Sequence, residues 1–196
     1  NGLFFDPITE QVIDYVGGQD DLKRQIVRAI GDPHARFAED KLRMLRAVRF
    51  ADTFSFALDP ATADAIRAHH TQLSQVSVER IAQELRRMLA HPSRALSVRM
   101  LQETLLLSEV LPEICNALGN LADSLAESVL DALEMPHSDS ALAVLLRGLY
   151  EPASVDFKQR RARLEETCRR LKLSNEELDC IVWLIEALPT MTDISA

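Results

Sequence analysis

Apolar residues recur every three or four positions along most of this chain, which is the spacing of one face of a helix. The two clearest stripes are Leu42, Leu45, Val48 with Ala51, and Ile81, Leu85, Met88 with Leu89. Together with the capping residues and prolines that bound the stripes, this spacing predicts helices over residues 20–30, 38–52, 61–71, 78–90, 92–104, 121–135, 140–150, 155–171 and 175–188. Ser174 and Glu177 have the spacing of a capping box at the start of the last helix. An all-α fold class follows.

The start of the chain has a different pattern. Two short runs rich in β-favouring residues, Leu3–Phe5 and Val12–Val16, are separated by Asp6-Pro7 and predict a β-hairpin. Because an isolated hairpin is marginally stable in water, we expect it to dock on the helices, to pair with a second copy of the chain, or to fray.

The composition agrees with helices packed around an aliphatic core. Of 196 residues, 47% are hydrophobic and only 5% aromatic, which suffices for one substantial core or two small ones. No apolar run approaches the roughly 20 residues that cross a bilayer, and the start lacks a basic region followed by an apolar segment. We therefore expect a cytoplasmic protein with no membrane partner.

Cysteine content and charge restrict the possible sites. The three cysteines, Cys115, Cys168 and Cys180, form no C-x-x-C pair, which indicates free thiols rather than a disulfide framework or a thiolate metal site. The net charge of −8 opposes binding of nucleic acid by the whole surface. Basic residues nevertheless cluster, most densely over residues 158–172, so that a local stripe could hold an RNA backbone.

The segment from Arg36 to Phe50 contains the most informative chemistry, the sequence Glu39-Asp40-x-x-Arg43. Residues three apart on a helix share a face, so the Asp40 carboxylate and the Arg43 guanidinium are expected to point into the same space. A carboxylate accepts from the exocyclic amine of cytosine or adenine, and a guanidinium donates to the neighbouring ring acceptors. The pair could therefore imitate the edge of a complementary base, or it could be an ordinary solvated ion pair.

Four motifs occur in order around this segment: N-G-L-F-F-D-P at residues 1–7, G-G-Q-D-D-L at 17–22, R-F-A-E-D-K-L-R-M-L-R-A-V-R-F at 36–50 and E-R-I-A-Q-E-L at 79–85. This series resembles the class II tRNA nucleotidyltransferase and bacterial poly(A) polymerase family. The resemblance covers the first half of the chain closely, and the second half resembles the family only as a helical body. Lys41 stands where the family usually has proline.

The resemblance implies an enzyme that transfers CMP, AMP or both from CTP and ATP to an RNA 3′ end, such as that of tRNA. Asp40 and Arg43 would bind the nucleotide base, with Glu39 and Arg46 in support. The segment around Glu84 would buttress them, with Glu84 either paired to an arginine or solvated.

For two further segments, the resemblance implies a functional role, and the residues alone also permit a purely structural one. Gly17-Gly18 would act as a hinge, although a simple strand-to-helix turn explains the same residues. Arg160, Arg163 and Arg170 are candidate RNA contacts, or members of a solvated face whose charge nearby glutamates offset.

The catalytic carboxylates of this family have no counterpart in the chain. G-G-x-V-R-D and D-x-D, which lie upstream in the family, do not occur, so the chain resembles a fragment that lacks most of the palm domain. Transfer of a nucleotidyl group needs clustered carboxylates to hold metal ions. We therefore expect Mg²⁺ only in the full-length enzyme, no metal site or catalytic residue in this chain, and no activity of the chain alone.

The expected organisation has three parts: a palm remnant over residues 1–19, a neck over 20–118 and a helical body over 119–196, with Gly119-Asn120 at the second boundary. The oligomeric state stays open. The alternative function is a non-catalytic helical module that binds RNA or protein. Within the enzyme class, CCA addition, addition of A alone and polyadenylation share these motifs.

Overall fold

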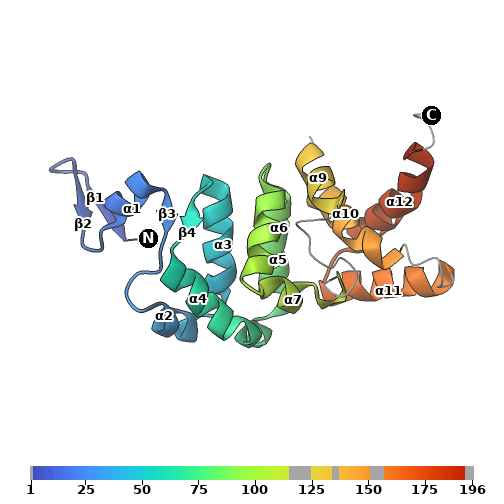
Figure 1. Ribbon diagram of the computed structural model, residues 1–196, viewed down its shortest axis with the longest axis horizontal. Coiled ribbons are helices and arrows are strands. Elements are labelled where there is room, and N and C mark those ends of the chain that lie inside the picture. Colours follow the sequence, from blue (N-terminus) through green and yellow to red (C-terminus); the bar gives the residue numbers. More distant parts are fainter. Residues whose placement is uncertain (1, 115–124, 134–136, 151–156, 193–196) are drawn as a thin grey trace.

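The computed structural model describes residues 2–114, 125–133, 137–150 and 157–192, and Figure 1 shows them as an elongated array of helices with a β-hairpin at one end. The all-α prediction is confirmed. In chain order the elements are β1 Leu3–Asp6, β2 Gln11–Asp14, α1 Gly18–Arg24, β3 Ile26–Val27, α2 Pro33–Glu39, α3 Leu42–Phe54, β4 Ala57–Leu58, α4 Pro60–His69, the 3₁₀ helix His70–Gln75, α5 Val78–Leu89, α6 Arg94–Glu103, α7 Leu106–Val110, α9 Leu125–Ala132, α10 Ser138–Tyr150, α11 Phe157–Arg170 and α12 Asn175–Thr192.

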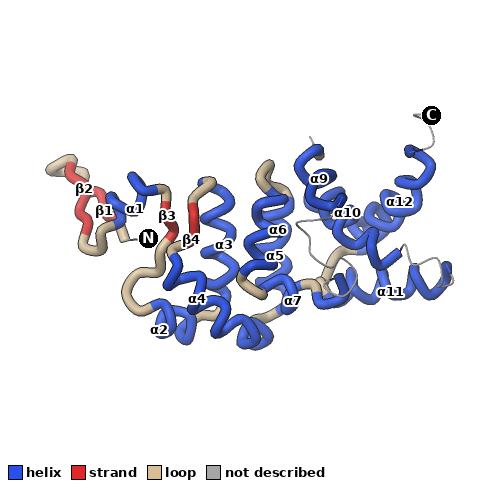
Figure 2. Tube along the Cα trace, viewed as in Figure 1, coloured by secondary structure: helices blue, strands red, loops and turns tan. Residues whose placement is uncertain are grey.

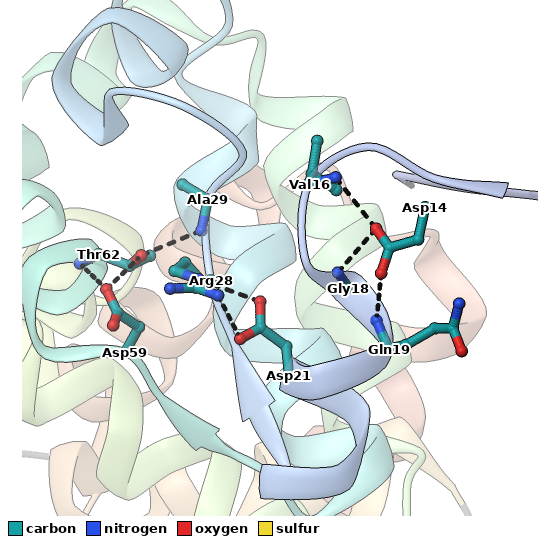
Figure 3. A network of polar contacts seen from close by, with 9 residues as sticks. All are labelled: Asp14, Val16, Gly18, Gln19, Asp21, Arg28, Ala29, Asp59 and Thr62. Atoms are coloured by element: carbon teal, nitrogen blue, oxygen red, sulfur yellow. Dashed lines mark hydrogen bonds and ion pairs between the residues drawn. The ribbon is translucent and has the colours of Figure 1, made fainter.

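The predicted hairpin is present and leads directly into α1. β1 and β2 are antiparallel, with Leu3 opposite Asp14. The Asp14 carboxylate then accepts the backbone N–H groups of Val16, Gly18 and Gln19, at 3.0, 3.0 and 2.9 Å (Figure 3). These hydrogen bonds, that from Gln19 foremost, hold the pKa of Asp14 below its usual range. An ionised Asp14 thus fixes the turn through Gly17, whose φ of 75° suits glycine.

The prediction of one helix over residues 20–30 is wrong at its second half. α1 ends at Arg24, and after Gln25 the chain forms β3, which pairs in parallel with β4; Figure 2 shows both strands in red. Backbone N–H groups of Ala57 and Asp59 donate to the carbonyls of Gln25 and Val27 at 2.9 and 3.0 Å. The partner strand lies about thirty residues later in the chain, so that local periodicity carries no sign of the pairing.

The prediction of one helix over residues 38–52 is also wrong, because the helix is interrupted at Asp40. Asp40 has an extended backbone, with φ −149° and ψ 107°, and separates α2 from α3. Its Oδ1 accepts the N–H of Leu42 at 3.1 Å, which satisfies one of the free donors at the start of α3. Asp40 therefore caps a helix.

The helices share one continuous hydrophobic core. Met44, Leu45 and Val48 of α3 are fully buried, as is Met88 of α5. α5 contacts α3, α6 and α10, and α10 in turn packs on α11 and α12, so the core continues through Leu145. The predicted boundary at Gly119-Asn120 lies outside the described residues.

Ion pairs join α5 to α3 and to α12. Glu84 is buried, with its side chain only 5% exposed, and accepts from Arg49 Nε of α3 at 2.5 Å and from Arg87 at 3.3 Å. Of the two alternatives for Glu84, the structure shows the arginine pair. Arg86 donates to Glu177 of α12 at 2.8 Å, and this hydrogen bond holds the pKa of Glu177 below its usual range. The capping box is confirmed, because Glu177 and Ser174 exchange hydrogen bonds of 2.6 and 3.1 Å.

Membrane spans and metal clusters are both absent from the described residues. None of the described helices is long and apolar enough to cross a membrane. No group of three or more His, Cys, Asp or Glu side chains among the described residues could hold a metal ion. Cys168 is buried, which raises the pKa of its thiol to about 11, and Cys180 is exposed; both are free.

Removal of the Glu84 carboxylate should destabilise the protein strongly. Glu84→Ala leaves Arg49, whose side chain is only 15% exposed, without this partner, and loss of one member of a buried pair costs about 3 kcal/mol. Urea denaturation measures this, with Glu79→Ala, an exposed glutamate on the same helix, as the control. Equal stability of the two variants would contradict a structural role for the Arg49–Glu84 pair.

Two substitutions of Asp40 should separate the contribution of its capping hydrogen bond to stability from the contribution of its charge. Asp40→Ala should lower the free energy of unfolding by about 1 kcal/mol, as loss of a capping side chain does, whereas Asp40→Asn retains an acceptor oxygen and should cost only a few tenths. Thermal or urea unfolding of the two variants checks this. If Asn costs as much as Ala, the oxygen does not act as the cap.

Candidate functional site

Asp40 is held from two sides. Its Oδ1 accepts from the backbone of Leu42, and its Oδ2 accepts from Arg80 Nη2 of α5 at 3.2 Å. The side chain is 31% exposed, and each carboxylate oxygen has a second lone pair. Asp40 can therefore still accept a hydrogen bond from a ligand while its orientation is fixed.

Arg43 lies in the first turn of α3 and is fixed by a single nitrogen. Its Nη1 donates to the Arg36 carbonyl at 3.0 Å and to Glu39 Oε2 at 2.5 Å. Glu39 also accepts from Arg36 Nη1 at 2.6 Å, and the hydrogen bond from Arg43 holds the pKa of Glu39 below its usual range, so Glu39 is ionised. Within the described part of the chain, Arg43 Nε and Nη2 have no partner, so this edge of the guanidinium can donate to a ligand.

Asp40 and Arg43 are neighbours, but they are not an ion pair. The Arg43 backbone N–H donates to the Asp40 carbonyl at 3.1 Å, whereas the two side chains have separate partners, Arg80 and Glu39. The structure thus contains no solvated pair between them in the described region. Sequence reasoning placed both on one helix and did not identify the roles of Arg80 and Arg36; the E-R-I-A-Q-E-L motif was the available signal for Arg80.

An arginine-lined cleft of about 260 Å³ lies next to Arg43. Its charged lining residues are Arg28, Arg36, Arg43 and Arg46, and its lining includes no acidic residue. Arg46 is exposed and lies over the Phe50 ring, with 5.8 Å between the guanidinium carbon and the ring centroid. Asp40 is not part of the lining. In a chain with net charge −8, this cleft is a local site for an anionic or acceptor-rich ligand.

The three distal arginines differ from one another. Arg170 donates to Glu113 at 2.8 and 2.7 Å and to the Val110 carbonyl at 3.0 Å, which ties α11 to the end of α7. Arg163 is exposed on α11. The side chain of Arg160 lies outside the described residues. Arg170 thus contributes to packing and Arg163 is exposed, and RNA binding by these arginines stays a prediction.

Parts of this chain are similar to known proteins. Residues 55–118 match a family model described as the probable RNA and SrmB-binding site of polymerase A. The chain is 42% identical over 100 residues to the CCA-adding enzyme of Lactobacillus helveticus, covering 51% of this chain and 25% of that protein. It is 41% identical over 127 residues to the CCA-adding enzyme of Pediococcus pentosaceus, covering 64% of this chain and 31% of that protein.

A solved structure matches nearly the whole chain. The CCA-adding enzyme of Bacillus stearothermophilus in complex with CTP aligns with a TM-score of 0.75 and 30% identity, covering 96% of this chain and 44% of that one. The chain spans about a quarter to a third of the curated relatives' length. The sequence matches and the shared arrangement of helices agree, and over nearly its whole length the chain is similar to part of the CCA-adding enzymes.

Proposed function

We propose that this chain is the nucleotide-selecting and RNA-binding part of an RNA nucleotidyltransferase that adds CMP, AMP or both to the 3′ end of tRNA or another RNA. The observation that carries the proposal is the free donor edge of Arg43, three residues after the oriented Asp40 carboxylate. The relatives' names support the reaction class, and the related structure from Bacillus stearothermophilus contains CTP.

The hydrogen-bonding pattern selects cytosine and adenine. Both bases present an amine beside a ring acceptor, so Asp40 accepts from the amine and Arg43 donates to the ring nitrogen, and also to the carbonyl of cytosine. Uracil and guanine present a carbonyl oxygen beside a ring N–H, which places an acceptor against the Asp40 carboxylate and a donor against Arg43. Such mismatched polar groups are rejected strongly because they remain unpaired.

Neighbouring side chains orient each of the two groups. Arg80 orients Asp40, and Glu39 orients Arg43 with help from the Arg36 carbonyl. Arg46, which lines the cleft together with Arg43, would brace the ligand or contact a phosphate. Asp40 and Arg43 are thus assigned to base binding, with Glu39 and Arg46 in support.

The described residues do not fit Mg²⁺, because they contain no cluster of three or more possible ligands. We assign the metal-dependent transfer to other parts of the full-length protein and the selection of CTP and ATP to this chain. The RNA would lie along residues 55–118, the region of the RNA-binding family match, with exposed Arg163 as a further phosphate contact.

Incorporation assays with the full-length protein test the reaction. Supplied with tRNA lacking its terminal nucleotides, the protein should incorporate CMP, AMP or both, and it should reject UTP and GTP. If neither CTP nor ATP is used, the transferase proposal fails and a non-catalytic RNA-binding or protein-interaction module takes its place.

Variants of the base-binding pair should lose selectivity in particular. Asp40→Asn and Arg43→Ala should each reduce the preference for CTP or ATP over UTP by about 10- to 100-fold, the range of one bidentate base contact. The measurement is kcat/KM with each nucleotide. Arg163→Ala is the control: it should keep base preference and weaken RNA binding in a salt-dependent way. Unchanged preference in Asp40→Asn would remove Asp40 from base selection.

A further inference from the structure

Arg28 is a cleft residue for which sequence reasoning found no function. It follows β3 directly, and its backbone is fixed on both sides. The N–H of Asp59 donates to the Val27 carbonyl at 3.0 Å, and the N–H of Ala29 donates to Thr62 Oγ1 at 3.0 Å. Thr62 is buried and is itself held by Asp59 at the start of α4 (Figure 3). The position of Arg28 is therefore set by the helical core.

The guanidinium of Arg28 is also held in place. Nε donates to Asp21 Oδ2 at 3.0 Å and Nη2 donates to Asp21 Oδ1 at 2.5 Å, a bidentate arrangement that Figure 3 shows. The Asp21 side chain is 17% exposed, whereas that of Arg28 is 43% exposed. Nη1 has no partner among the described residues and can donate outward. Because the side chain is already oriented, a ligand would bind with less loss of rotamer freedom.

The surroundings of Arg28 favour a negatively charged ligand. Its neighbours in the cleft lining include Arg36, Arg43 and Arg46, without an acidic residue. Asp21 instead lines a second hollow of about 540 Å³, to whose lining Arg28 also contributes. Asp21 therefore holds the Arg28 guanidinium without itself lining the arginine cleft, and the cleft lining contains no carboxylate that would repel an anion.

We propose that Arg28 donates from Nη1 to a phosphate of the nucleotide or RNA that occupies this cleft, with Asp21 as its positioning residue. The proposal rests on the proposed function for the cleft's ligand. The recognised chemistry is a phosphate oxygen, from either the incoming nucleoside triphosphate or the phosphodiester backbone at the RNA 3′ end. Arg28 contributes affinity without base preference, in contrast to Asp40 and Arg43.

Binding measurements on the full-length protein distinguish the two sources. Arg28→Gln removes a charged donor, which should weaken binding about tenfold. If the phosphate belongs to the nucleotide, CTP binding weakens and cytidine binding does not. If it belongs to RNA, CTP binding is unchanged, while RNA affinity falls and the magnitude of its salt slope decreases by about one. Unchanged CTP and RNA binding would overturn the proposal.

Matched variants separate a phosphate contact from a folding defect. Arg24→Gln is the control, because Arg24 is exposed on α1 and has no described hydrogen bond or ion pair. Arg28→Lys keeps the charge and should bind between wild type and Arg28→Gln. Arg28→Lys binding as poorly as Arg28→Gln, together with a lowered melting temperature in both, would assign Arg28 to stability and overturn the proposal.

The base preference of each variant separates this inference from the proposed function. Arg28→Gln should retain the wild-type preference for CTP over UTP, whereas Arg43→Ala should lose it. If the wild-type protein has no base preference, the base-selection proposal is wrong. Even then, a tenfold loss of CTP affinity without loss of cytidine affinity in Arg28→Gln would establish the phosphate contact.

Discussion

The buried ion pair between Arg49 and Glu84 fixes α3 against α5, and the candidate site depends on that placement. Arg80 lies four residues, about one turn, before Glu84 on α5, so the two side chains point to the same side of the helix. Glu84 contacts Arg49 in the body of α3, and Arg80 contacts Asp40 at its start. A shift or rotation of α5 would disturb both contacts. The buried Arg49–Glu84 pair therefore also helps to hold Arg80 where it orients Asp40.

The break between α2 and α3 gives Asp40 two roles at once. The start of a helix presents free N–H groups and the positive end of the helix dipole, both of which favour a carboxylate. One oxygen of Asp40 satisfies such an N–H, while the second remains near the surface with Arg80. In an uninterrupted helix over residues 38–52, the N–H of Leu42 would donate to the Ala38 carbonyl within the helix. The carboxylate would then lack this anchor, and a flexible carboxylate is a poor selector of bases.

The sequence correctly predicted those elements that depend on residues close together in the chain. Helix stripes such as Ile81, Leu85 and Met88, the first hairpin and the Ser174–Glu177 box follow from spacing within a few residues, and the structure confirms them. The β3–β4 pairing depends on a partner about thirty residues away, and the break at Asp40 interrupts an apolar pattern that continues on both sides. At the site, residue types identified Asp40 and Arg43, but their partners Arg80 and Glu39 are set by tertiary packing and by side-chain rotamers that spacing does not encode.

Each of three side chains that we propose as ligand contacts is oriented by one oppositely charged neighbour. Arg43 is held by Glu39 and Asp40 by Arg80, and Arg28 is held in the same way by Asp21. In each pair the opposite charge occupies part of the functional group and leaves another part free to bind. Such pairing limits the local excess of charge in the free protein and reduces the rotamer entropy lost on binding. Selectivity at this site then arises from the direction in which fixed donors and acceptors point, and the total charge of the cleft contributes affinity that every phosphate-bearing ligand would share.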